Sequence, residues 1–315
     1  MRKNLIIYET NYGTSKKVGK IFSLLLGASK LVDINDNPRN VNLYENIVFI
    51  FGFHGFTTAE KIEEYIKDNR EELLKKKIAI IGVGIAKQDL DKYSEKLTTA
   101  LQKDVNFKGF IEGELRINKL TDKDKEDLEK FLAKVNMPFI DMGKFKPEQV
   151  YDLAKKCTEV VNKPMKTMDD RLLMEEIKKF ILSHNTCALA TGVKDFIRCT
   201  PIEYAYFNEK FYFITEGGLK FKGILQNPNV SIGIFDGYIG MDKLMGLQVT
   251  GRAEIVNRDT YEYEEVMKLK GVQLKALDNL PINLNIVKVS ADKYEFLNSD
   301  FKKIGLDSKQ ILINI

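Results

Sequence analysis

The loop at residues 10–15 holds the first group of side chains that could do chemistry. An apolar run at residues 4–9 predicts a strand before the loop, and helical spacing of apolar residues after it predicts a helix. Hydroxyl groups, backbone N–H groups and the positive end of a helix dipole can together hold a terminal phosphate at such a junction. A hydroxyl-rich helix cap is the simpler alternative. The residues are Thr10, Asn11, Tyr12, Gly13, Thr14 and Ser15.

The spacing of this loop limits the kind of phosphate ligand. A Walker A loop needs Gly-Lys-Ser/Thr after four residues, and a dinucleotide turn needs GxGxxG. The loop matches neither pattern, which disfavours nucleoside triphosphates. Gly82 and Gly84, after a later apolar run, would allow a ring to approach the backbone closely or would only form a turn.

Three aromatic side chains, Phe53, His54 and Phe56, could stack on a planar ligand. The chain has two histidines, His54 and His184, which disfavours a histidine-ligated metal or haem site and a Ser-His-Asp arrangement. His184, at a predicted helix end, suits a cap better than a catalyst.

The three cysteines are odd in number and widely spaced, which fits reduced structural thiols better than a disulfide framework or an iron–sulfur site. They are Cys157, Cys187 and Cys199.

The elements of the first half alternate between strands and helices. Strands are predicted at residues 4–9, 31–34, 47–51, 78–83 and 107–115, with helices around residues 59–74, 90–101 and 146–162. Alternation of this kind predicts a parallel sheet covered on both faces.

The first half resembles the flavodoxins through YETNYGTSKKVG, which is similar to the loop that holds the FMN phosphate in that family. Its later segments, GFIEGELRINKL and MGKFKPEQVYDLAKKC, resemble the flavodoxin-type protoporphyrinogen oxidases. The resemblance implies a doubly wound domain over residues 1–164, with an FMN held by residues 10–15 and Gly82. The segment TDKDKEDLEKFLAKV is predicted to be a solvated helix, without membrane contact.

The second half, over residues 165–315, changes in character. Asp169 and Asp170 can cap a helix, and strand-like runs follow at residues 186–191, 196–207, 210–215, 230–235, 244–256 and 284–289. Helices are predicted at about residues 219–226 and 260–270. Several short strands with few helices predict a β-barrel.

This half resembles the FMN-binding split barrels related to pyridoxamine phosphate oxidase, above all in KFYFITEGGLKFKGILQNPNVSIGIFDG. The resemblance implies that Thr215, Lys220 and Lys222 grip the FMN phosphate. Their chemistry agrees, because lysines supply charge for a phosphate dianion, and Arg198 could add a bidentate contact. A solvated helix face is the alternative for the lysines. Gln248 is a weaker candidate contact from a neighbouring subunit, since the resemblance also implies a homodimer.

The carboxyl end of the chain lacks the basic, histidine-bearing segment that such oxidases use for pyridoxal phosphate, so oxidation of vitamin B6 is disfavoured. Lys and Arg total 49 against 45 for Asp and Glu, and a net charge of +4 does not argue for nucleic acid. The apolar run near the amino end is too short for a signal peptide or a membrane span, so a cytoplasmic protein is expected.

Three hypotheses follow. The first is an FMN-dependent oxidoreductase whose two flavins exchange electrons and whose donor is NAD(P)H or a small electron-transfer protein. The second is an electron carrier without a substrate of its own. In the third, the first domain has lost its cofactor and serves for docking. Protoporphyrinogen oxidase activity remains an alternative, no metal is expected, and the sequence identifies no catalytic residues.

Overall fold

The computed structural model describes residues 3–54, 58–273, 277 and 280–314. The chain divides into two units, Met1–Lys163 and Pro164–Ile315, and each is described by itself. Phe56, one of the three aromatic residues considered for stacking, lies outside the described residues.

The first unit is built on a parallel sheet of five strands in the order β2-β1-β3-β4-β5. The strands are β1 (Asn4–Glu9), β2 (Ser29–Asp33), β3 (Asn46–Gly52), β4 (Lys77–Gly84) and β5 (Phe107–Glu112). The order reverses between β1 and β3, and open α/β sheets bind ligands in the crevice at the carboxyl ends of the strands at such a point.

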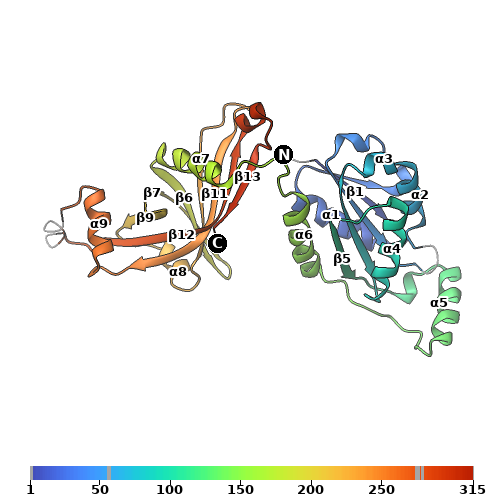
Figure 1. Cartoon of the computed structure of the whole chain (residues 1–315). Helices are drawn as coiled ribbons and strands as arrows, with labels where there is room; N and C mark the ends of the chain where they lie inside the picture. Colours follow the sequence, from blue (N-terminus) through green and yellow to red (C-terminus); the bar gives the residue numbers. More distant parts are fainter. Residues whose placement is uncertain (1–2, 55–57, 274–276, 278–279, 315) are drawn as a thin grey trace. The chain divides into compact units, whose positions relative to one another are not determined.

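Helices cover both faces of this sheet, as predicted (Figure 1). One face packs against α1 (Thr14–Leu26) and α6 (Pro147–Val161). The other packs against α2 (Glu60–Asp68), α3 (Arg70–Leu73) and α4 (Asp89–Leu101). Burial on both faces explains why β1, β3 and β4 read as continuous apolar runs.

Two elements of this unit differ from the sequence prediction. The helix expected at residues 59–74 is interrupted at Asn69, whose side-chain amide donates to the Tyr65 carbonyl at 2.9 Å. Asparagine side chains compete with backbone hydrogen bonds in this way. The fifth strand ends at Glu112, and a single bridge between Leu115 and Met142 follows it.

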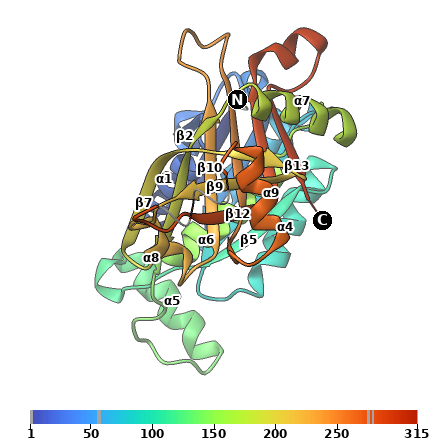
Figure 2. The ribbon, with the colours of Figure 1, turned by 90° about the vertical axis from the view of Figure 1, so that its left-hand side faces the viewer.

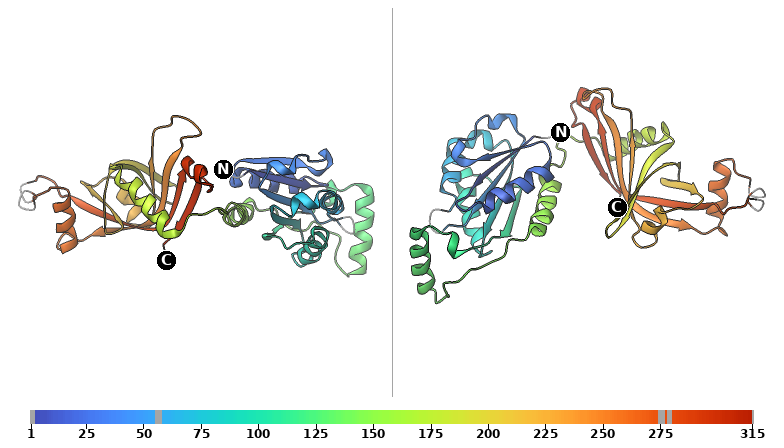
Figure 3. Two further views of the ribbon diagram at one scale, coloured as in Figure 1. Left: turned by 45° about the horizontal axis from the view of Figure 1, so that its top comes forward. Right: turned by 180° about the vertical axis from the view of Figure 1, so that it is seen from behind.

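The charged segment after β5 forms α5 (Asp122–Lys134), which projects from the first unit (Figure 3). Thr121 caps it by accepting the Asp124 N–H at 3.2 Å. Leu132 is its one buried residue among those described, which confirms the prediction of a solvated helix. Short 3₁₀ turns at Ile34–Asp36, Val41–Leu43 and Ile117–Lys119 complete the unit.

The second unit is a curled antiparallel sheet with the path β7-β6-β10-β11-β12-β9-β8, and β13 pairs with β12 (Figure 2). Its strands are β6 (Thr186–Val193), β7 (Phe196–Glu203), β8 (Ala205–Phe207), β9 (Lys210–Thr215), β10 (Asn229–Phe235), β11 (Met245–Val256), β12 (Asn285–Asn298) and β13 (Lys309–Ile313).

The concave face of this sheet forms the main core, together with α7 (Asp170–Leu182) and α8 (Lys220–Ile224). The Asp169 carboxylate accepts the N–H groups of Arg171 and Leu172, so it caps α7 as predicted. A smaller core lies under α9 (Tyr261–Leu269), which Thr260 caps.

Three strands of this unit differ from the prediction. The run at residues 196–207 divides at Tyr204, whose N–H donates to the Asn185 carbonyl and whose hydroxyl donates to the Ile181 carbonyl. The strand expected at residues 284–289 continues to Asn298, and β13 was not predicted. A 3₁₀ turn at Ser299–Ile304 joins these last two strands.

Within the described residues, no helix combines the length and the apolar composition that a membrane span needs.

Candidate functional sites

The hydroxyl-rich loop lies at the carboxyl end of β1, beside the point where the strand order reverses. The Thr10 hydroxyl accepts the Gly13 N–H at 2.9 Å, and Gly13 has a φ of 88°. Ser15 is buried, and its hydroxyl oxygen lies 3.4 Å from where a Cβ on Gly52 would stand. The loop therefore places hydroxyl groups at the first turn of α1, where backbone N–H groups lack intrahelical acceptors.

Tyr12 connects this loop to α5. Its hydroxyl donates to the Asp124 carboxylate and accepts the Thr121 N–H at 3.3 Å. His54 Nε2 lies 3.4 Å from Asp124 Oδ1, and the rings of His54 and Tyr12 are 6.3 Å apart between centroids. The hydrogen bond from Tyr12 is the largest cause that lowers the pKa of Asp124, while burial raises the pKa of Tyr12.

The glycines at the end of β4 face a side chain of their own domain. A Cβ on Gly82 would lie 2.7 Å from the Phe53 ring and 2.9 Å from Leu90, and one on Gly84 would clash with the same ring. Phe53 also packs against Tyr93, with 5.0 Å between ring centroids. The structure thus places Gly82 next to the Phe53 ring, at the position for which the sequence predicted either the approach of a ligand ring or only a turn.

A folded turn follows β9 in the second unit. The Thr215 hydroxyl accepts the Gly217 N–H at 3.3 Å, and the Lys220 ammonium donates to the Gly217 carbonyl. Gly217 and Gly218 have φ values of 131° and 103°, a region that favours glycine. The turn therefore brings Thr215 and Lys220 to one peptide unit.

Lys220 is 7% exposed, and no carboxylate in the described part of the chain lies within ion-pair distance of it. Burial lowers its pKa, an effect that nearby Glu216 opposes and Arg198 increases. A buried cation is costly unless an anion or several hydrogen bonds compensate it. Lys220 therefore remains a cation that an added anion would compensate, with Arg198 and the opposing Glu216 nearby.

Helix α8 packs against β6 and β7 (Figure 2), and this contact brings Lys220 toward Arg198. Lys222, on the same helix, lies over the Phe196 ring at 4.5 Å and is exposed. It therefore reaches the strand that carries Arg198 without joining the turn around Gly217.

Gln248 lies on the opposite face of the sheet. It pairs with Gly233 on β10, which in turn pairs with Ala188 on β6, whereas Arg198 pairs with buried Thr191. Directly paired residues of an antiparallel sheet share a face. Within one chain, Gln248 is thus separated from Lys220 and Arg198.

His184 and two of the three cysteines lie in structural surroundings. The His184 ring follows α7, with Nδ1 at 2.9 Å from the Phe180 carbonyl and Nε2 at 2.9 Å from the Asp236 carboxylate. Cys157 and Cys187 are buried, and burial raises the pKa of each thiol to about 12. Cys199 is exposed.

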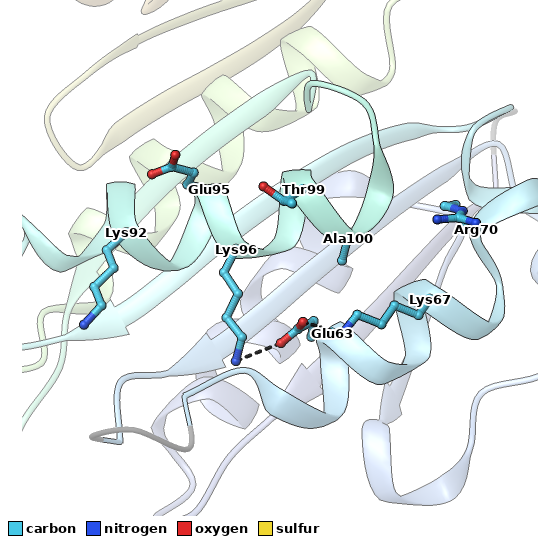
Figure 4. A pocket seen from close by; sticks show the side chains of 8 residues that line it. All are labelled: Glu63, Lys67, Arg70, Lys92, Glu95, Lys96, Thr99 and Ala100. Carbon is cyan, nitrogen blue, oxygen red and sulfur yellow. Dashed lines mark ion pairs between the residues drawn. The ribbon is translucent and has the colours of Figure 1, made fainter.

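A polar groove of about 620 Å³ separates α2 from α4 (Figure 4). Glu63 accepts from Lys67 at 2.6 Å and from Lys96 at 2.9 Å across it. Arg70 and Lys92 also line it, and none of the residues predicted to bind FMN does. The groove is distinct from both sites described above.

Neither the contact of Asp124 with Tyr12 nor the hydrogen bonds that Thr215 and Lys220 make to the Gly217 peptide unit follow from the sequence. Asp124 is 112 positions from Tyr12, so no local pattern signals their contact. Gly217 belongs to the sequence motif that resembles the split barrels, but its role as a shared partner of Thr215 and Lys220 depends on the fold of the turn.

Comparison with protein families matches two consecutive regions. Residues 5–136 match the flavodoxin domain family, and residues 173–298 match the pyridoxamine 5'-phosphate oxidase family. A search of curated proteins gave no significant match.

Several solved structures are similar to about two fifths of the chain. A pyridoxamine 5'-phosphate oxidase-like protein from Listeria innocua is 17% identical, with 40% of this chain and 98% of that chain covered and a TM-score of 0.34. A FAD-binding protein from Mesorhizobium loti is 18% identical, with coverages of 38% and 89% and a TM-score of 0.32. A heme storage protein from Vibrio cholerae is 19% identical, with coverages of 38% and 89% and a TM-score of 0.33.

The order of the two matched regions agrees with the order of the two sheets, parallel first and antiparallel second. The chain is therefore a fusion of a flavodoxin domain and a split-barrel domain of the pyridoxamine 5'-phosphate oxidase type.

Proposed function

We propose that the protein is an FMN-dependent oxidoreductase with one flavin site in each domain, and that electrons pass between the two flavins. Both matched families bind flavins, which supports a flavin-associated redox role. The observation that carries the proposal furthest is the buried Lys220 residue, whose ammonium has no carboxylate partner within ion-pair distance among the described residues.

The residues of the split barrel fit the phosphate of FMN. Lys220 and Arg198 supply positive charge, and Thr215 supplies a hydroxyl group beside them. Charge-assisted contacts of this kind are about twice as strong as hydrogen bonds between neutral groups. Lys222 reaches β7 and adds charge at the edge of the same region.

The residues of the first domain fit a phosphate through hydroxyl and backbone N–H groups. Thr10, Gly13, Thr14 and Ser15 surround the first turn of α1, a helix of 13 residues whose dipole favours an anion at this end. The Phe53 ring packs over Gly82 and Gly84, so these glycines are not open to a flavin ring in this conformation. We therefore assign only the binding of the flavin phosphate, to the residues of the loop at 10–15.

Bound FMN would supply the hydride or electron transfer, and the protein's own residues bind and orient it. Lys220, Arg198 and Thr215 hold the phosphate end in the barrel, and the loop at residues 10–15 does so in the first domain. No side chain of either site is assigned a proton-transfer step.

A homodimer through the outer face of the split barrel is part of the proposal. Split barrels of the matched family are often dimeric, which supports this part of the proposal. The outer face carries Gly233, Gln248 and the Lys293–Glu295 ion pair, and Phe235, at one end of it, is 67% exposed. In a dimer, Gln248 of one subunit could contact a flavin held by the other.

Turnover with small-molecule donors tests the proposed activity. The FMN-loaded full chain is reduced anaerobically with NADH or NADPH, and a quinone or ferricyanide is then supplied under steady-state conditions. Sustained turnover supports an oxidoreductase. Chemical reduction without turnover would contradict it and would favour the electron carrier.

A further inference from the structure

A small polar network joins three segments of the first domain that are far apart in the sequence. Asp124, at the start of α5, accepts the Tyr12 hydroxyl and lies 3.4 Å from His54 Nε2. Tyr12 belongs to the loop after β1, and His54 follows β3. The Thr121 N–H donates to the Tyr12 hydroxyl and strengthens the same junction.

The network lies beside the point of the sheet at which the strand order reverses. β1 and β3 are the two strands between which the strand order reverses. Tyr12, soon after β1, and His54, soon after β3, therefore lie on the two sides of this switch point, and Asp124 connects them. The Asp124 side chain is 24% exposed and that of His54 is 37% exposed, so the connection lies near the surface of the domain and not in the core.

Helix α5 makes few buried contacts with the rest of the domain. Leu132 is its one buried residue among those described, and its ion pairs at Lys125–Asp122 and Lys130–Glu126 are internal to the helix. Local openings cost least where few apolar contacts are buried. The contact between Asp124 and Tyr12 can therefore open without disturbing the sheet.

We propose that Asp124 is a positioning residue that closes the first flavin site by holding Tyr12 and His54 together across the crevice between β1 and β3. Flavin then enters and leaves when this contact opens. The inference rests on the proposed flavin site of the first domain and adds a gate to it.

The test is the kinetics of FMN binding to the full chain, followed by the change in flavin fluorescence. Asp124→Ala and Tyr12→Phe should each raise both the association and the dissociation rate of one kinetic phase by about tenfold, the size expected for loss of a hydrogen bond to a charged group. If the two residues only shaped the phosphate loop, their substitution would raise the dissociation rate of FMN and leave its association rate unchanged.

Three further variants sharpen the test. The double variant Y12F/D124A should exceed neither single variant, because both remove one contact. Asp124→Asn keeps an oxygen that can accept from Tyr12 and should have a smaller effect. Glu126→Gln, which breaks only an ion pair within α5, should leave both rates unchanged.

Amide hydrogen exchange of α5 in the flavin-free chain checks the contact itself. It should rise in both single variants, while the strands of the sheet stay protected. Unchanged exchange, or a change in dissociation alone, would overturn the gate. The kinetic phases of FMN binding are also compared between the wild type and Gly13→Glu. If the variant kept every phase of the wild type unchanged, the proposed flavin site of the first domain would be contradicted, and the gate with it.

Discussion

At the residue scale, the two candidate sites differ in how they would hold an anion. The loop at residues 10–15 contains hydroxyl groups and N–H groups and no cationic side chain. The split-barrel site contains Lys220, which is 7% exposed, and Arg198 close enough to lower its pKa. Affinity for FMN in the barrel should therefore depend strongly on single charged residues.

Replacing Lys220 by Met should weaken FMN binding to the barrel by about 10- to 100-fold, since a hydrogen bond to a charged group contributes about 1.5–3 kcal/mol. Isothermal titration of the full chain measures the change. Lys302→Met, at an exposed position in the turn before β13, is the matched control. Equal affinity of the Lys220 variant and the wild type would remove Lys220 from the site.

Glu63 gives a pH-dependent prediction. The hydrogen bond from Lys67 is the first cause that holds the pKa of Glu63 below its usual value, and Lys96 adds to it. A carboxyl group with a lowered folded-state pKa stabilises the fold above its unfolded pKa, and this stabilisation is lost as pH falls through the folded pKa. Glu63→Gln should thus cost about 0.5–1 kcal/mol at pH 7 and progressively less below about pH 4.5.

The measurement is the free energy of unfolding of the first domain in urea at pH 7 and at pH 3. Glu95→Gln, on the same groove but without an ion pair among the described residues, is the control. An equal loss at both pH values in Glu63→Gln would contradict the role of the two lysines.

At the element scale, the end of β4 depends on glycine because Phe53, directly after β3, packs over it. The Phe53 N–H donates to the Val83 carbonyl at 2.8 Å, and the ring then lies over Gly82 and Gly84. The glycines therefore serve the packing of Phe53 in the flavin-free domain.

Gly82→Ala should destabilise the first domain by about 1–3 kcal/mol, because the new Cβ meets Phe53 at 2.7 Å in a packed region. In a Phe53→Ala background the added cost should fall, although Leu90 at 2.9 Å remains. Gly113→Ala, whose Cβ would first meet the Gly84 backbone at 3.5 Å, should be nearly neutral. Chemical denaturation of the four variants measures these differences, and an unchanged cost without Phe53 would contradict this interpretation.

The sequence predicted the elements that have strong periodicity. The parallel strands, α6, α7 and α5 follow from apolar spacing and cap residues that act locally. The interruptions at Asn69 and Tyr204 were not predicted, because side chains bonding to backbone groups decide them. β13 was missed because its register depends on β12.

The candidate sites also combine features that follow from local sequence with features that depend on tertiary contacts. Thr215, Lys220 and Gly217 lie within six positions, so their motif was visible in the sequence. The contact of Tyr12 with Asp124 and the separation of Gln248 from Arg198 both depend on tertiary arrangement. Neither could be derived from spacing along the chain.

At the scale of the whole molecule, the proposal requires a second copy of the chain on the outer face of the barrel. Phe235→Glu places a charge on that face and should shift the protein from dimer to monomer in sedimentation experiments, because an unpaired charge is costly at an interface. Leu24→Glu, at an exposed position of α1, should leave the mass unchanged. A monomeric wild type would contradict the proposed dimer.

The proposed function requires one chain to hold two flavins, one in each domain. The decisive measurement is the FMN content per chain after reconstitution of the full chain and of two variants, Lys220→Glu in the barrel and Gly13→Glu in the hydroxyl-rich loop. We predict two FMN in the wild type and one in each variant. A single FMN that Gly13→Glu does not affect, or no FMN in the wild type, would contradict the claim.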